Sequence, residues 1–197
     1  MGSSRVPEVL EMVGHLHYNK PDAIDAAAGG AIVSDVALSG LSAGVMTVAA
    51  QPDYPRVLRA FLTDANASIT SATITIVGLD ASGEGITDVL AITAAGVKDG
   101  VKAFAKVTSA TWALVTGTLT GSSDKIAIGV GKALGLPMVP GGILPVLIKA
   151  NFTNADDLAT INQTYKTITI VGTLDATNLI EVWFRYKYLL KGHDLNA

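Results

Sequence analysis

Residues 70–78, with the sequence TSATITIVG, decide the fold class of this chain. Ala72, Ile74 and Ile76 alternate with hydroxyl-bearing residues, and successive side chains of a β-strand point to opposite faces of the sheet. The stretch therefore predicts a strand with one apolar face and one polar face. The sequence LDASGEG at 79–85 is rich in turn-forming residues, so residues 86–93 are predicted to return as the second strand of a hairpin.

Short runs of Val, Ile, Thr and Ala, separated by Gly, Asp, Asn and Ser, continue on both sides of this hairpin. Further strands are predicted at residues 57–63, 102–108, 111–116, 125–130, 143–150, 167–171 and 180–190. The chain is therefore expected to be all-β, a single domain built as a β-sandwich, a jelly roll or a β-barrel-like module. At most one or two short helices are expected, one of them at 154–163, where Asn154 would cap an acidic first turn.

Residues 1–30 differ from the rest of the chain, because they are punctuated by Pro and partly charged. We interpret them as an N-terminal arm, followed by a β-rich core domain over 31–197. Val9, Leu10 and Val13 suggest one or two amphipathic helical turns, too short to be stable alone, so the arm is expected to dock on another surface. The first five residues are too short and polar to read as a signal peptide.

Composition excludes several classes of partner. Fourteen Lys and Arg against seventeen Asp and Glu, with no basic run, argue against direct contact with nucleic acid. The uncharged stretches are interrupted and shorter than the roughly 20 apolar residues of a membrane-spanning helix, so no membrane partner is expected. Only 16% of residues are charged, against about 25% in a typical soluble domain. This deficit suggests a surface partly covered by other subunits.

Candidate chemistry is sparse. His15 and His17 sit two residues apart, with Glu11 and Asp22 near them in the sequence, but a histidine pair at an interface explains them better than a metal site. The sequence GVGKALG at 129–135 fails the P-loop pattern because Lys132 is followed by Ala, and its glycines are expected to let a strand leave the sheet. We therefore expect no catalytic residues, no metal, no cofactor and no enzymatic activity.

The C-terminal run at 181–190 is more informative. Its even positions are all apolar or aromatic, whereas Trp183 and Arg185 belong to the other face, where an aromatic beside an arginine is typical of an interface anchor. The alternative is that Trp183 lies under another strand of the same chain. The predicted partner interface combines the arm with this face: Val9, Leu10, Val13, His15, His17, Tyr18, Trp183 and Arg185.

A succession of short motifs gives the chain a family resemblance. They are QPDYPR at 51–56, TDAN at 63–66, TITIVGLD at 73–80, KAFAKVTS at 102–109, and the stretch from SDKI at 123–126 to GLP at 135–137. In this order the motifs resemble a family of head proteins of tailed phages and prophages, over about residues 50–140. The arm and the C-terminal strand lie outside the resemblance.

The resemblance implies a virion structural protein, namely a capsid decoration or cement protein that binds and stabilises the phage head. Its implied partners are the major capsid protein and copies of itself, as a homotrimer, on the outer surface of the head after synthesis in the host cytoplasm. A tail, adaptor or fibre-base protein of the same virion is the first alternative. A carbohydrate-binding or adhesion β-sandwich is the second, although the 6% aromatic content argues against a sugar-binding platform.

Overall fold

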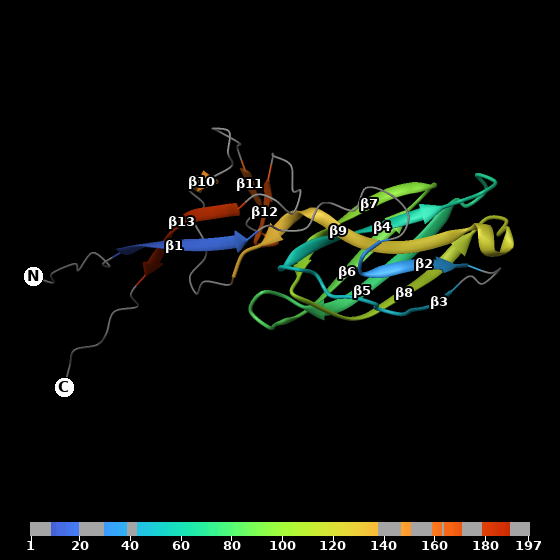
Figure 1. Cartoon of the computed structure of the whole chain (residues 1–197), viewed down its shortest axis with the longest axis horizontal. Helices are drawn as coiled ribbons and strands as arrows, with labels where there is room; N and C mark the ends of the chain where they lie inside the picture. Colours follow the sequence, from blue (N-terminus) through green and yellow to red (C-terminus); the bar gives the residue numbers. More distant parts are fainter. Residues whose placement is uncertain are drawn as a thin grey trace, which may run out of the picture.

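The computed structural model describes residues 9–19, 30–38, 43–137, 147–150, 159–162, 164–170 and 179–189, and their regular secondary structure is almost entirely strand (Figure 1). The one helical element among these residues is a 3₁₀ turn, η1 (Gly121–Ser123). The described residues contain no helix that is long and apolar enough to cross a membrane. The strands are β1 (Val9–Asn19), β2 (Val33–Ala37), β3 (Gly44–Met46), β4 (Arg56–Thr63), β5 (Ser71–Leu79), β6 (Gly85–Ile92), β7 (Gly96–Phe104), β8 (Lys106–Thr116), β9 (Lys125–Gly135), β10 (Leu147–Ala150), β11 (Ala159–Asn162), β12 (Thr167–Ile170) and β13 (Leu179–Leu189).

A four-stranded antiparallel sheet contains the stretch that decided the fold. Its strand order is β3-β8-β5-β6, and β5 and β6 form the predicted hairpin with Ile76 opposite Asp88 and Leu79 opposite Gly85. The alternation along β5 is as predicted: Ala72, Ile74 and Ile76 are buried, whereas the residues between them are partly or fully exposed. The hydroxyl-bearing side chains therefore occupy the outer side of this sheet.

A six-stranded sheet faces it, with the order β11-β12-β9-β4-β7 and β2 also paired to β9. Strand β9 is central to this sheet, because one of its edges pairs with β4 while the other pairs first with β2 and then with β12. The two sheets enclose one apolar core, which confirms the predicted all-β sandwich. The core includes Leu58 and Leu62 of β4, Ile74 and Ile76 of β5, Leu90 of β6, Trp112 of β8, and Ile126 and Ile128 of β9.

A third sheet lies beyond one end of the sandwich, in the order β1-β13-β10 (Figure 1). Strand β1 comes from the predicted arm, and its partner β13 comes from the range predicted as the core domain. The two pair antiparallel along their whole length, from Val9 opposite Leu189 to Asn19 opposite Leu179. The arm therefore docks on the C-terminal strand of its own chain.

Several sequence predictions need correction. The helical turns expected at Val9, Leu10 and Val13 are wrong, because these residues belong to β1. The helix expected at 154–163 is wrong where the structure describes it, since Ala159–Asn162 form β11; residues 154–158 and 163 lie outside the described residues. In both places a partner strand outweighs a weak local preference for helix.

Two strand boundaries also differ from expectation. The strand expected at 102–108 is instead a corner, where β7 ends at Phe104 and β8 begins at Lys106. The glycines of 129–135 do not release the strand from the sheet, because β9 continues to Gly135. Gly131 lies where the register between β4 and β9 shifts, and a Cβ there would lie 2.8 Å from the carbonyl oxygen of Val57.

Candidate functional site

The residues predicted as a partner interface all lie on the ladder formed by β1 and β13. Val13 pairs with Arg185, His15 with Trp183 and His17 with Glu181, although these partners are about 170 residues apart in the sequence. Val9, Leu10 and Tyr18 lie on the same ladder. Two predictions made separately, for the arm and for the C-terminal strand, thus concern a single two-stranded ladder.

The register of this ladder places residues of opposite charge type at paired positions. Glu11 is the register partner of Lys187, and His17 is the register partner of Glu181. Opposite charges directly across an antiparallel pair stabilise it by about 0.2–1 kcal/mol. A shift by one residue would lose both pairings, and it would move every side chain to the other face.

Tyr18 fastens the ladder to the sandwich. Its side chain is buried, and its hydroxyl donates a hydrogen bond of 2.8 Å to the carbonyl oxygen of Gly135 at the end of β9. Its ring meets the ring of Tyr54 edge to face, with 5.3 Å between centroids. Burial raises the pKa of Tyr18, which keeps its hydroxyl protonated as a donor. Tyr18 therefore makes an internal contact, whereas the other seven interface residues stay a prediction.

Arg56 fixes the same end of the sandwich. Its side chain is fully buried, and its Nε and Nη2 donate to the carbonyl oxygen of Gly131 at 3.1 and 2.7 Å. Its Nη1 donates to Asp53 Oδ1 at 3.1 Å, which pairs the buried guanidinium with a carboxylate. The sequence alone placed Asp53 and Arg56 only in a motif, because nothing in it indicates that Arg56 is buried and paired with Asp53.

Two further polar residues of the motifs that carry the resemblance, Gln51 and Asp64, also bind backbone groups. The Gln51 side chain accepts from the Val107 N–H at 2.7 Å and donates to the Val107 carbonyl oxygen at 3.1 Å, as a strand would. Asp64 accepts from the N–H of Ile69 at 2.8 Å. Gln51 thus satisfies backbone groups at the start of β8, and Asp64 satisfies one in the loop before β5, so both side chains stabilise the fold.

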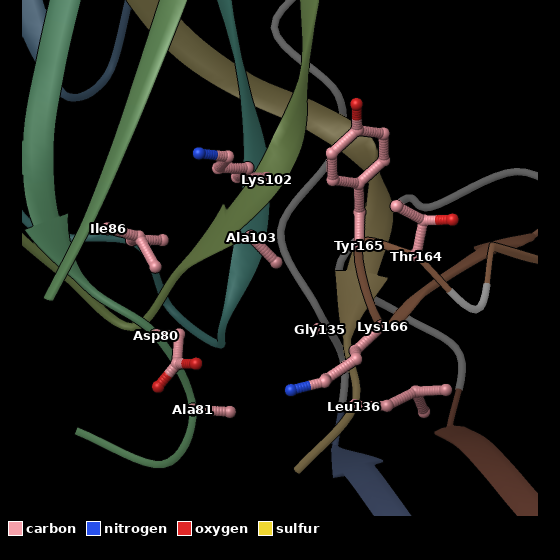
Figure 2. Close-up of a pocket in the computed structure, with 10 residues that line it drawn as sticks. All are labelled: Asp80, Ala81, Ile86, Lys102, Ala103, Gly135, Leu136, Thr164, Tyr165 and Lys166. Carbon is pink, nitrogen blue, oxygen red and sulfur yellow. The ribbon is translucent and has the colours of Figure 1, made fainter. Parts of the chain in front are cut away.

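A small pocket of about 140 Å³ lies between the β5–β6 turn, β7 and the segment before β12 (Figure 2). Lys102 and Lys166 reach it from opposite sides, and the half-exposed Tyr165 stands at its rim. Lys102 Nζ already donates to the carbonyl oxygen of Thr87 at 2.6 Å, and Asp80 Oδ1 accepts from two backbone N–H groups of its turn. Two of the pocket's charged side chains, Lys102 and Asp80, thus bind backbone groups of the fold.

The described residues offer no cluster of side chains that could bind a metal ion. Among the residues that the structure describes, no group of three or more His, Asp or Glu side chains is placed to hold a metal ion. His15 and His17 are described by their ladder positions, opposite Trp183 and Glu181. Their interpretation as an interface pair stays a prediction.

The strand character of β1 is the main feature that sequence reasoning missed. Four of the five even positions from 10 to 18 are apolar or aromatic, namely Leu10, Met12, Leu16 and Tyr18, and such alternation in steps of two is the signal of a strand. The apolar residues at 9, 10 and 13 obscured that signal. Comparison of the chain with family models, with curated proteins and with solved structures found no match.

Proposed function

We propose that this chain is a non-enzymatic structural subunit of a tailed-phage virion, where it decorates and cements the head. The succession of motifs between residues 51 and 137 supports the virion role by resemblance alone. The proposal also fits a chain in which Gln51 and Asp64, two polar residues of these motifs, bind backbone groups of their own fold. On this proposal the protein is made in the host cytoplasm, and its partners are the major capsid protein and other copies of itself.

The observation that carries the assembly role is the position of β1. It is the terminal strand of its sheet, and among the described residues it pairs with β13 alone, along all eleven of its residues. A long edge strand presents a row of backbone N–H and C=O groups that a strand of a neighbouring protein can pair with. A cement protein must bridge neighbouring subunits, and a strand of a neighbouring subunit could pair with the free edge of β1.

Purified heads of the phage or prophage that encodes the chain provide the test. Mass spectrometry of the virions should detect the chain on the head fraction, and heads assembled without it should bind the purified protein. Val13→Asp on β1 should weaken this binding, whereas Val97→Asp on β7 should not. Deletion of residues 1–30 should abolish binding while circular dichroism still shows a folded β-domain.

The outcomes separate the alternatives. Recovery of the chain in the tail or at the portal vertex would assign it to the tail or adaptor class instead. Absence from virions, or unchanged binding by Val13→Asp and by the deletion, would refute the decoration role. A clear hit on a glycan array would favour an adhesion module.

A further inference from the structure

The side chain of Asp88 links the two sheets of the sandwich along one side. Asp88 lies in the middle of β6, a terminal strand of the four-stranded sheet, and the next strand along the chain, β7, is a terminal strand of the six-stranded sheet. The buried Asp88 carboxylate accepts hydrogen bonds from the backbone N–H groups of Val101 at 2.7 Å and Lys102 at 3.1 Å, both on β7. One carboxylate therefore holds two sheet edges together.

Strand β7 bulges to reach this carboxylate. The register between β4 and β7 shifts after Val57, so that residues 100–102 of β7 stand opposite the single residue Leu58 of β4. Such a bulge releases backbone groups from the ladder, and here the N–H groups of residues 101 and 102 turn to Asp88. The bulge also requires Gly100, because a Cβ at this position would collide with Asp88 Oδ2.

The outer edge of β6 presents the backbone groups of its odd-numbered residues. In an antiparallel pair, residues that exchange hydrogen bonds across the pair alternate with residues that do not. The hydrogen-bonded set of the β5–β6 hairpin is even-numbered, because the N–H of Asp80 donates to the carbonyl oxygen of Glu84 at 2.9 Å and the register is unbroken as far as Ala72 opposite Ile92. Residues 87 and 89 therefore turn their N–H and C=O groups away from β5.

Asp88 and Lys102 occupy this outer edge in the middle of β6. Asp88 Oδ1 accepts from the N–H of Val89 at 3.1 Å, and Lys102 Nζ donates to the carbonyl oxygen of Thr87 at 2.6 Å. A strand that adds to β6 would need both backbone groups, since strand addition proceeds through the outward N–H and C=O groups of the edge strand. It would also have to pull Asp88 away from β7 and leave a buried carboxylate short of donors.

We propose that Asp88 and Lys102 form an edge guard, which closes this side of the sandwich to strand addition by another chain. Inward-pointing charged residues and bulges in edge strands are two means by which β proteins prevent edge-to-edge association. The side formed by β6 and β7 has both of them. The edge guard is independent of the virion role, and it leaves strand addition to other edges such as that of β1.

Removal of the Asp88 carboxylate tests the edge guard. Asp88→Ala should increase self-association of the full chain at least about tenfold over wild type, in sedimentation from about 10 µM to 1 mM, because the edge of β6 becomes available. Asp124→Ala is the matched control, since Asp124 is also a buried carboxylate that accepts backbone N–H groups, from Ala65 and Thr120, but it lies between η1 and β9. Asp124→Ala should lower stability without increasing association.

Lys102→Met is a second variant, and it serves if Asp88→Ala fails to fold. It keeps the stem of the side chain and frees the carbonyl oxygen of Thr87. Association should rise above that of wild type, by less than for Asp88→Ala. Lys98→Met removes an exposed lysine from the same strand and should leave association unchanged.

A spin label locates the association. The chain has no Cys, so Ala91→Cys places one thiol on β6 and Val45→Cys places one on β3, the other terminal strand of the same sheet. In the Asp88→Ala background, dipolar coupling between copies should appear for the label at 91 and not for the label at 45.

Three outcomes would overturn the edge guard. They are folded Asp88→Ala and Lys102→Met proteins that associate no more than wild type, equal association of Asp88→Ala and Asp124→Ala, and equal coupling at positions 91 and 45. Each measurement is made without phage heads, so none of these outcomes bears on the binding of the chain to heads.

Discussion

At the scale of single residues, buried carboxylates and glycines decide how the loops and strands meet. Asp124 is fully buried, and it accepts hydrogen bonds from the backbone N–H of Ala65 and from the backbone N–H and hydroxyl of Thr120. These donors, the Ala65 N–H foremost, hold the pKa of Asp124 below its usual value despite its burial. One side chain thus ties together the loops that follow β4 and β8.

Asp124→Asn should lower the free energy of unfolding by about 1–3 kcal/mol at pH 7, because the charged acceptor is lost while the N–H donors stay buried. A lowered pKa in the folded state stabilises the fold above the unfolded value of 3.8, and this contribution is lost as the pH falls through the lower folded pKa. Urea unfolding of both proteins from pH 7 to pH 2 should show their difference shrinking below about pH 4.

The control for this experiment is Glu84→Gln, which removes a carboxylate that is exposed in the β5–β6 turn. It should change stability by less than about 0.5 kcal/mol at any pH. A gap between wild type and Asp124→Asn that stays constant down to pH 2 would show that the charge of Asp124 does not hold these loops.

Gly44 is needed for a steric reason, because the Trp112 ring leaves no space for a side chain at this position. A Cβ at this position would collide with Cη2 and Cζ2 of the Trp112 ring, which is buried in the core across from β3. Gly44→Ala should therefore destabilise the protein by about 1–3 kcal/mol in urea unfolding. Gly85→Ala, where a Cβ would meet nothing within 4 Å, should be close to neutral.

Trp112→Phe provides the second arm of that test. The smaller ring makes room for a Cβ at 44, and it removes the indole N–H, which is buried without a hydrogen-bond partner among the described residues. Gly44→Ala should thus cost less in the Trp112→Phe background than in wild type. Equal costs in both backgrounds would mean that the Trp112 ring is not the obstacle.

At the scale of elements, the same short sequence forms a strand in two settings. TITI occurs at 73–76 in β5 and at 167–170 in β12. Strand β5 lies at the centre of the four-stranded sheet, whereas β12 joins β11 to β9 in the other sheet. Strong β propensity and alternation are enough to make the strand, and the neighbours decide where it goes.

The β1–β13 ladder allows a direct test of an element's register. Glu11→Lys places two cations opposite each other and should lower stability by about 0.5–1 kcal/mol, and Lys187→Glu should do the same with two anions. The double variant Glu11→Lys/Lys187→Glu should recover most of the loss in thermal unfolding at low salt. If the double variant is as unstable as the sum of the single variants, Glu11 and Lys187 are not cross-strand neighbours.

At the scale of the whole molecule, charge is distributed unevenly. The six-stranded sheet carries surface ion pairs, the strands of the four-stranded sheet contain only Asp88 and Lys106 as charged residues, and a long edge strand lies at one end of the sandwich. The head-binding experiment tests the β1 edge.

The sequence alone determined the all-β class, the β5–β6 hairpin and most of the central strands, because alternation and turn residues are local signals that act within a few residues. It also singled out His15 and Trp183, one at each end of the chain. Only the tertiary structure decided that these two residues are opposite each other, that residues 9–19 form a strand, and that Asp124 and Arg56 are buried. The physical reason is that β pairing and burial depend on partners distant in the sequence, and a strand acquires its conformation from the neighbour that completes its hydrogen bonds.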